Sequence, residues 1–434
     1  MYQWLETGLR DALFADARRL VQALLNDRSL VHDDESPRPL ENVHHNRLRH
    51  VQTLFGSIEL RRRYYHHTVA RTGRHPLDEA LDLVRGCTPA LARLICHASA
   101  QCGSYDEAAR DLALYTGLQL ESRHFGRLVA EAAPTLRGAL DTLPVEERPP
   151  VAVFYVECDG TGVPMRREEL EGRGGKQPDG SSRTREAKLG CVFTQILTAP
   201  GGEEPMRDPD STSYVATFEG CRHIGTLLRK EALRRGLAQA RKTVCLGDGA
   251  PWIWENARLN FPTAIQILDF YHACEHAGEL AAALWGQGTE EARAQQDSWC
   301  HLMKKTSSAP LIKQARILER KRHRLLGEIQ SQTIQREIQY FQTNSARTRY
   351  GHFRAKGFFI GSGVIEAGCK TVVGRRLKQS GMFWSQHGAE DLLSLRCLLL
   401  GPHFDAAWKA RLPILAKQRT KARRWSHPEN KKAA

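Results

Sequence analysis

Three acidic residues stand at places where a carboxylate is available for chemistry. Asp159 follows the apolar run VAVFYVEC and Asp248 follows the apolar segment TVCLG, and each precedes a glycine. Both are predicted to lie at the C-terminal end of a strand, where doubly wound and RNase H-like sheets present their sites. Glu366 lies in GSGVIEAGCK, where glycines lead into a predicted helix that carries Glu366 and Lys370 on one face. A single aspartate after a strand is also common as a turn former or helix cap, so each acid alone has a structural explanation.

Together the three acids indicate a chemistry that none indicates alone. Carboxylates that converge from separate elements form an oxygen-ligand cage for two hard cations such as Mg²⁺ or Mn²⁺. Two such ions, roughly 3.5–4 Å apart, activate an attacking water or hydroxyl and stabilise the leaving oxygen of a phosphoryl displacement. The pattern therefore predicts a metal-dependent nuclease or transferase in which Asp159, Asp248 and Glu366 are both the metal ligands and the catalytic residues.

The charge of the chain favours a nucleic-acid partner. Its 434 residues include 63 Lys and Arg against 49 Asp and Glu, a net charge of +14, and an excess of this size favours a polyanion such as DNA. No run approaches the roughly 18 apolar residues of a membrane span, and the N-terminus lacks a signal-peptide pattern. We expect a cytoplasmic, nucleoid-associated protein with no membrane partner. The eleven cysteines include no C-x-x-C pair, so we expect reduced, buried thiols.

The elements that must position the acids are predicted to form a multidomain α+β and α/β protein. A helical N-terminal DNA-binding region precedes a mixed-sheet core, and the proline-rich segment PVEERPP from Pro144 is the best boundary between them. In the N-terminal region, Ser104 and Glu107 form a capping box and Gly117 ends a helix, as in a helix-turn-helix. The expected divisions are an N-terminal helix and polar linker (1–50), a β-hairpin with a helix-turn-helix-like region (51–143), a first core part (150–285), a helical insertion (286–355), a C-terminal core helix region (356–402) and a basic tail (403–434).

Four segments resemble blocks of the ISKra-type insertion-sequence transposases of bacteria, which are DDE enzymes related to the Mutator-like and hAT transposases. They are DGTGVPMRREELEGRGGKQPDGSSRTREAKLGCVFTQ, LGDGAPWIWE, LDFYHACEH and GSGVIEAGCKTVVGRRLKQSGMFWS. The similarity spans roughly residues 50 to 400. It implies an RNase H-like core with an all-helical insertion between the second Asp and the Glu, so that Asp159, Asp248 and Glu366 are the three catalytic acids in order and hold two Mg²⁺ ions.

The same resemblance implies the reaction and the assembly. The protein would bind the terminal inverted repeats of its element and catalyse metal-dependent strand cleavage and strand transfer. A homo-oligomer, a dimer or larger, would bring two ends together. Members of this group often carry cysteine pairs after the arginine-rich strand, and this chain has none there, so we expect its N-terminal region to fold without metal.

The segment LDFYHACEH has two interpretations. His272, Glu275 and His276 form H-x-x-E-H, in which two histidines one helical turn apart bind zinc and the glutamate is the base, as in a zinc peptidase. Asp269 and His272 also fit the D-x-x-H signature of hAT- and Mutator-like transposases, where the pair looks like structural support beside the active site. Net charge and the two other aspartates favour the transposase. The alternatives are the zinc peptidase and a domesticated DNA-binding protein that no longer cuts.

Basic and aromatic side chains are candidates for DNA contacts. They lie on the arginine-rich strand, the last predicted helix before Pro144, the glycine-rich hairpin and the segment after Glu366. For the basic residues a solvated surface is the alternative explanation, and for Trp384, which could stack on an unpaired base, it is core packing. The candidates are Arg61, Arg62, Arg63, Arg123, Arg127, Lys176, Arg183, Arg185, Lys370, Arg375, Arg376, Lys378 and Trp384.

Overall fold

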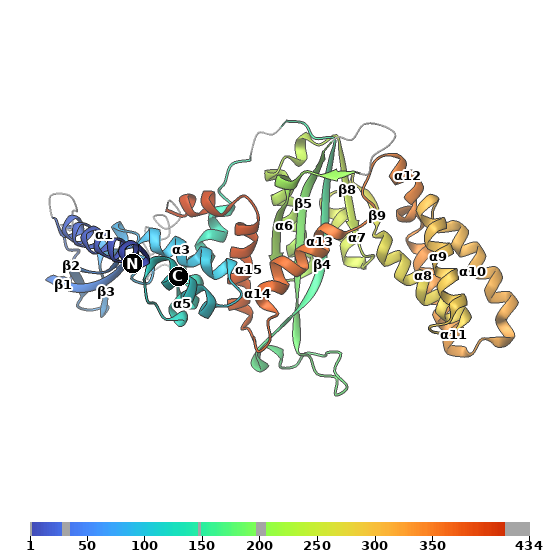
Figure 1. Ribbon diagram of the computed structural model, residues 1–434, viewed down its shortest axis with the longest axis horizontal. Coiled ribbons are helices and arrows are strands. Elements are labelled where there is room, and N and C mark those ends of the chain that lie inside the picture. The colour runs from blue at the N-terminus through green and yellow to red at the C-terminus, as the bar shows by residue number, and fades with distance from the viewer. Residues whose placement is uncertain (1, 28–34, 146–148, 197–204, 413–434) are drawn as a thin grey trace. The chain divides into compact units, whose positions relative to one another are not determined.

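The computed structural model describes residues 2–27, 35–145, 149–196 and 205–412 and is a mixture of helices and strands (Figure 1). The chain divides into two compact units, one made of Met1–Leu143 with Ser385–Ala434 and the other of Pro144–Trp384. The division falls beside the proline-rich segment at which the sequence predicts a boundary. Among the described helices, none is both long enough and apolar enough to cross a membrane.

The first unit contains a three-stranded antiparallel sheet in the order β1-β2-β3, covered by helix α1. Along β2, Ile58 and Leu60 are buried between exposed neighbours, and this face packs against Val21 and Leu25 of α1. Residues 41–50, expected in a polar linker, instead belong to strand β1, because backbone pairing with β2 orders a segment that lacks apolar alternation. The elements are α1 (Tyr2–Asn26), β1 (Glu41–Thr53), β2 (Gly56–His67), β3 (Thr72–Arg74) and α2 (Pro76–Ala80).

Three helices follow in the first unit, as the sequence predicts. The Ser104 hydroxyl accepts a hydrogen bond from the Glu107 amide at 3.0 Å, which begins the second helix, and Gly117 ends it with a φ of 76°. Phe125 and Leu128, on the third helix, are fully buried in the core of the unit. The helices are α3 (Pro89–Gln101), α4 (Tyr105–Thr116) and α5 (Ser122–Leu140).

Helix α15 (Gln386–Leu400) was expected at the end of the catalytic core, but it belongs to the first unit. Leu395 lies in the same buried cluster as Ile95 of α3, and Asp391 accepts a hydrogen bond from Arg137 of α5 at 2.9 Å. Of the expected basic tail, residues 404–412 are helical and pack on this core, and residues 413–434 lie outside the described residues.

The second unit is built on a mixed sheet in the order β6-β5-β4-β8-β9, with β7 also paired to β5. β4 is antiparallel to β5 and parallel to β8, β8 is parallel to β9, and β5 is antiparallel to β7. β4 was expected to end at Asp159 but continues to Pro164, because its polar second half pairs with β5. The strands are β4 (Val153–Pro164), β5 (Thr184–Ile196), β6 (Met206–Arg207), β7 (Ser213–Thr217), β8 (Lys242–Gly247) and β9 (Ile265–Leu268).

Helices cover both faces of this sheet. Leu189 and Gly190 are neighbours on β5 and therefore face opposite sides. A Cβ on Gly190 would lie 2.5 Å from Leu228 of α6, whereas a Cβ on Gly368 of α13 would lie 3.2 Å from Leu189. Helices α6 and α13 thus pack on opposite faces, each at a glycine that permits close approach. The helices are α6 (Cys221–Arg234), α7 (Pro251–Asn260) and α13 (Gly363–Gly368).

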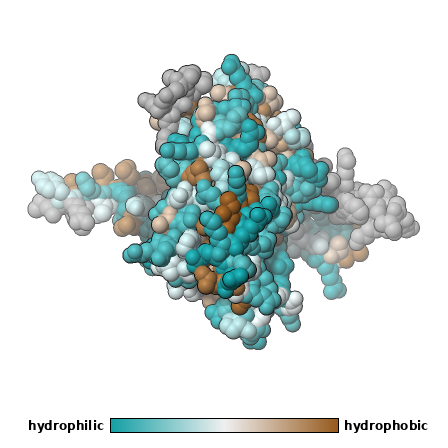
Figure 2. Space-filling view, turned by 90° about the vertical axis from the view of Figure 1, so that its right-hand side faces the viewer, coloured by the Kyte–Doolittle hydropathy of each residue, from teal (hydrophilic) through white to brown (hydrophobic). Residues whose placement is uncertain are grey.

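An all-helical segment extends from the β9 end of the sheet (Figure 1), as the sequence predicts for residues 286–355. Its surface is mostly hydrophilic (Figure 2), with a few exposed apolar side chains such as Ile329, which is 81% exposed. The elements are α8 (Phe270–Trp285), α9 (Glu290–Lys305), α10 (Ala309–Arg322), α11 (Glu328–Thr343), η5 (Ser345–Thr348) and α12 (Tyr350–Ala355).

The segment after Glu366 is not the continuous α-helix that the sequence predicts. The short α13 passes into a π-helix, η6 (Cys369–Gly374), and then into α14 (Arg375–Leu377). The wider π turn changes which side chains share a face: Glu366 and Lys370 are exposed, and Val373 and Leu377 are buried. All eleven cysteines lie in the described part of the chain as free thiols, six buried and five half-buried.

Candidate functional site

Three aspartates lie at the same level of three adjacent parallel strands. In the ladder between β4 and β8, Glu157 is opposite Leu246, and in the ladder between β8 and β9, Leu246 is opposite Ile267. Two residues further along each strand, this register places Asp159 beside Asp248 and Asp248 beside Asp269. The sheet therefore brings two of the predicted catalytic acids together and adds the predicted supporting residue next to them.

Helix α13 is attached across this edge by two buried carboxylates. Glu157 is 1% exposed, and its Oε2 accepts a hydrogen bond from the Ile365 amide at 2.9 Å. Asp269 is also 1% exposed and accepts hydrogen bonds from the amides of Ser362 and His272. These bonds satisfy amides at the first turns of α13 and α8, which have no partner within their own helices. They fix the backbone that carries Glu366.

Glu366 lies within the electrostatic reach of Asp159. The Ser362 hydroxyl donates to Oε1 of Glu366 at 3.0 Å, and the Cys369 thiol donates to Oδ2 of Asp159 at 3.4 Å. Burial raises the pKa of Asp159, and the charges of Asp248 and Glu366 raise it further. Asp248 and Glu366 thus each disfavour a negative charge on Asp159, and a bound cation would relieve this repulsion. Carboxylate oxygens are also the donors that Mg²⁺ and Mn²⁺ prefer, so the donor chemistry of the three acids suits such ions.

Burial raises the pKa of Glu157 to about 8, and the nearby charges of Asp269 and Glu366 act in the same direction. Its Oε1 has no hydrogen-bond partner. At neutral pH, burial therefore favours the protonated, neutral form of this side chain. It supports α13 without adding a further negative charge to the site.

The backbone at Asp248 is held from the helical insertion. The Tyr340 hydroxyl of α11 donates to the Asp248 carbonyl at 3.1 Å, and the Asp248 carboxylate accepts from the Ala250 amide at 2.9 Å. Gly249 has a φ of 101°, and a Cβ there would lie 2.7 Å from the Tyr340 hydroxyl. Only glycine fits this turn without strain, which explains the Asp-Gly pair after β8.

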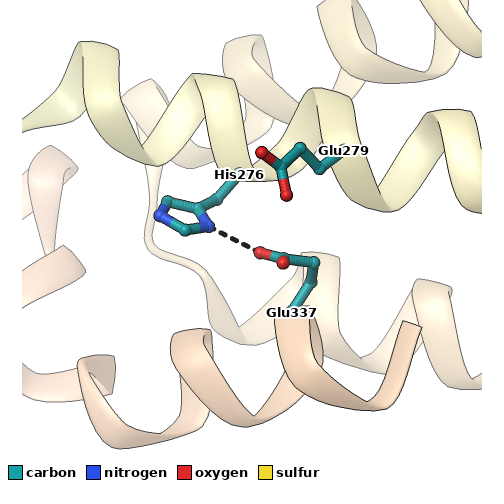
Figure 3. Close-up of side chains that lie close together, drawn as sticks. All are labelled: His276, Glu279 and Glu337. Atoms are coloured by element: carbon teal, nitrogen blue, oxygen red, sulfur yellow. Dashed lines mark hydrogen bonds and ion pairs between the residues drawn. The ribbon is translucent and has the colours of Figure 1, made fainter. Parts of the chain in front are cut away.

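The H-x-x-E-H motif is split between two contacts. His272 Nδ1 lies 3.1 Å from Glu275, whereas His276 Nδ1 lies 2.5 Å from Glu337 of α11 (Figure 3). Within the described part of the chain, His276, Glu279 and Glu337 form a group whose potential metal-ligand atoms all lie within 4.8 Å of one another.

Arg336 already contacts both carboxylates of this group, Glu337 at 2.7 Å and Glu279 at 2.8 Å. Burial alone would raise the pKa of Glu337, but the hydrogen bonds from His276 and Arg336 outweigh it and lower that pKa. The His276 ring stacks on Tyr340 with 3.7 Å between ring centroids. The cluster is thus an ion-pair network beside Tyr340, in which Arg336 already pairs with both carboxylates.

Most of the predicted DNA-contacting side chains reach the surface. Arg123 forms an ion pair with the neighbouring Glu121, and Lys378 donates to the Thr161 hydroxyl. Arg63 and Arg185 are half-buried. The exposed members of the set are Arg61, Arg123, Arg127, Lys176, Arg183, Lys370, Arg375 and Lys378.

Two predicted DNA contacts are buried instead. Arg62 is 8% exposed and bonds to Asp78 at 2.6 Å, and Arg376 is 1% exposed with its guanidinium 5.4 Å from the Trp384 ring. Trp384 is half-buried, and its indole N–H donates to the Leu377 carbonyl at 3.1 Å. Arg62 and Arg376 therefore have structural roles in this conformation, because alternation along β2 and the π turn before α14 point them inward. Trp384 has a packing role here.

Sequence reasoning missed Glu157, Ser362, Cys369 and Tyr340 as parts of the site. Glu157 carried a usable signal, since an acid inside the apolar run VAVFYVEC, two residues before Asp159, must face the same side of the strand. Ser362 lies four residues before Glu366, its local partner, but its amide bonds to the distant Asp269. Cys369 and Tyr340 carry no local signal, because their partners in the site, Asp159 and Asp248, lie far away in the chain.

Residues 3–173 are similar to a family described as an uncharacterised protein family (UPF0236). The matched region is less than half of the chain and includes Asp159 but neither Asp248 nor Glu366. Among curated proteins, none is detectably similar in sequence.

Proposed function

We propose that the protein is a DDE transposase that cuts and joins DNA at the ends of its own insertion sequence, with Asp159, Asp248 and Glu366 as its catalytic acids. The observation that carries this proposal is their convergence. Asp159 and Asp248 lie at one level of adjacent parallel strands, and the charge of Glu366 acts on Asp159 from a helix that packs over them. The similarity of four sequence segments to ISKra-type transposases supports the same assignment.

We further propose that the second unit is an RNase H-like core. Its central strand carries the first acid, two parallel strands lie beyond it on one side, and antiparallel strands lie on the other. The helices α9 to α12 come between the second and third acids, where the resemblance places an all-helical insertion. Asp269 and His272, which fit the D-x-x-H signature, lie where β9 passes into α8.

The residues of the site have separate roles in this mechanism. Asp159, Asp248 and Glu366 hold the cations, Glu157 and Asp269 position α13, and Tyr340 positions the backbone of Asp248. Two bound Mg²⁺ ions supply charge stabilisation at the attacking and leaving oxygens. Water attacks the phosphodiester at the end of the element and releases a 3′-hydroxyl, and this hydroxyl attacks a phosphodiester of the target and displaces its 3′-oxygen.

The proposed partner is DNA, bound by the exposed basic side chains of both units. Neutralised phosphates release counterions, so this affinity should fall with salt concentration. Because the two ends of one element must be brought together at the same target, we expect a homo-oligomer, at least a dimer, in the active complex.

The test is strand cleavage of a DNA fragment that contains the flanks of the gene, with Mg²⁺, Mn²⁺ or Zn²⁺. Asp159→Asn, Asp248→Asn and Glu366→Gln should abolish nicking at a defined repeat and leave DNA binding intact or stronger, since each removes a negative charge that faces phosphate. Glu291→Gln is the matched control, because Glu291 is exposed on α9 in the same unit.

Near-normal cleavage by any of the three variants would remove that residue from the catalytic set. Specific binding of the flanks without cleavage under any metal would favour the non-cutting DNA-binding protein. Retention of zinc on purification, lost with His276→Ala, together with no DNA binding, would favour the zinc peptidase.

A further inference from the structure

A cavity of about 460 Å³ lies in the second unit, at the end of β9 opposite the acids. Ala264, Ile265 and Gln266, at the start of β9, line it, whereas Asp269 follows the other end of the strand. Four steps along extended chain, from Ile265 to Asp269, place Asp269 about 13 Å from the start of the strand. The volume of the cavity falls in the range of small-molecule sites, roughly 300–1,000 Å³. The cavity is therefore a separate candidate site, of a size that suits an organic ligand.

The lining is strongly basic. Arg347, Arg349, His352 and Lys356 all line the cavity, and none of the described residues that line it is acidic. None of the ion pairs among the described residues involves these four side chains. Desolvation lowers the pKa of His352, and the charges of Lys356 and Arg349 lower it further. Three permanent positive charges thus face one cavity without a carboxylate to balance them.

Arg347 is oriented by neutral groups. Its Nε donates to the Gln266 side chain at 2.8 Å and its Nη1 to the Asn344 side chain at 2.9 Å. Its guanidinium also lies 4.4 Å from the centre of the Trp254 ring. These contacts fix the orientation of the guanidinium group of Arg347 but do not neutralise its positive charge, although the side chain is half-buried. A half-buried cation held in this way is stabilised by an anion that enters the cavity.

The rest of the lining is mostly apolar and includes two aromatic rings. Phe353 and Phe358 line the cavity and are almost fully buried, and Lys242 at the start of β8 lies 5.5 Å from the Phe358 ring. A site that combines cations with apolar rings suits a ligand with a phosphate and an organic part. A carboxylate would supply one negative charge, whereas a phosphate monoester or diphosphate supplies two or more and matches the guanidinium fork.

We infer that this cavity binds the phosphate of a phosphorylated small molecule about the size of a mononucleotide, with Arg347, Arg349 and Lys356 as the anion-binding residues. This inference does not depend on the proposed transposase activity, because the cavity shares no residue with the three acids. The shared chemistry is a phosphate group. A free nucleotide and inorganic phosphate or pyrophosphate are its possible sources.

The test is calorimetric titration of the full-length protein with inorganic phosphate, pyrophosphate, AMP and ATP. EDTA is present throughout, so that a nucleotide cannot bind through a metal ion held by the acids. We expect AMP or ATP to bind more tightly than inorganic phosphate, since the organic part would add contacts with the apolar lining of the cavity. Arg349→Ala combined with Lys356→Ala should weaken binding at least tenfold. Both side chains are exposed, so the double variant should fold.

The matched control is Arg320→Ala combined with Lys321→Ala, which removes two exposed cations from the end of α10 and should leave the affinity unchanged. The Arg347→Lys substitution keeps the positive charge but removes the paired N–H donors of the guanidinium group, so it should also weaken binding. Asp159→Asn should bind as the wild type does, even if DNA cleavage is lost or was never present.

Two results would overturn the inference. One is that the wild type binds none of the four ligands, or that the double variant at 349 and 356 binds as well as the control. The other is that the double variant loses affinity only for a short single-stranded oligonucleotide while no mononucleotide binds. The cavity would then be part of a DNA surface rather than a small-molecule site.

Discussion

Replacing Asp269 should release the helix that carries Glu366. In Asp269→Ala the amides of Ser362, which is buried, and of His272, which is half-buried, lose their common acceptor. A buried donor left without a partner costs about 1–3 kcal/mol, so the loss at Ser362 should be about 1–3 kcal/mol, and the lost helix cap at His272 adds about 1 kcal/mol. In Asp269→Asn one carbonyl oxygen remains to accept one of the two amides, and the loss should be about half as large.

Hydrogen exchange of a peptide that spans residues 360–368 measures this loss directly. A loss of about 2 kcal/mol corresponds to roughly 30-fold faster exchange, because about 1.4 kcal/mol is a factor of ten. Thr289→Ala is the control: Thr289 caps α9 through the Ala292 amide, so its loss should affect α9 and leave 360–368 unchanged. Unchanged exchange of 360–368 in folded Asp269→Ala would refute the proposed role of Asp269.

Two further predictions concern the same edge of the sheet. Since burial raises the pKa of Glu157 from its ordinary 4.5 to about 8, the folded protein keeps a proton that the unfolded chain has released between these pH values. The free energy of unfolding that this proton contributes is complete below about pH 4.5 and is lost as the pH rises through about 8. In urea denaturation, the free energy of unfolding of the wild type should therefore fall by about 3 kcal/mol relative to that of Glu157→Gln between about pH 6 and pH 9. Parallel pH profiles of the two proteins would contradict this prediction. Tyr340→Phe removes the hydrogen bond to the Asp248 carbonyl but keeps the ring on His276. The Tyr340→Phe substitution should lower the free energy of unfolding by about 1 kcal/mol. It should also lower kcat for DNA cleavage without changing the affinity for DNA, whereas equal losses of affinity and rate would show that Tyr340 has only a structural role.

Local sequence signals predicted the helices of the first unit and the core strands well. Ser104, Glu107 and Gly117 mark the ends of α4 through contacts only three or four residues long, so the sequence contains the whole signal. The apolar run before Asp159 predicted β4 for a similar reason. The same reasoning failed for β1 and for the second half of β4, because polar strands are ordered by their partners.

The sequence also failed to predict which side chains of a basic run point to the surface. The arginine runs at 61–63 and 375–376 looked uniformly basic, yet Arg62 and Arg376 are buried beside exposed neighbours. For Arg62 the alternation of a paired strand decides this, and for Arg376 a π turn does. A π turn adds one residue to a helical turn and so rotates every later side chain of the helix to a different face. The residue spacing of an α-helix does not predict this change.

The sequence by itself determined which residues have the chemical types for the proposed reaction: acids after two apolar segments and on a glycine-led helix, in a chain with a surplus of cations. Only the tertiary structure decided that Asp159 and Asp248 lie side by side on adjacent strands and that α13 is held by hydrogen bonds to Glu157 and Asp269. It alone also gathered Gln266, Arg347 and Lys356 around one cavity. The physical reason is the same in both cases. Residue type and periodicity are local properties of the chain, whereas proximity depends on contacts between segments that are distant in sequence.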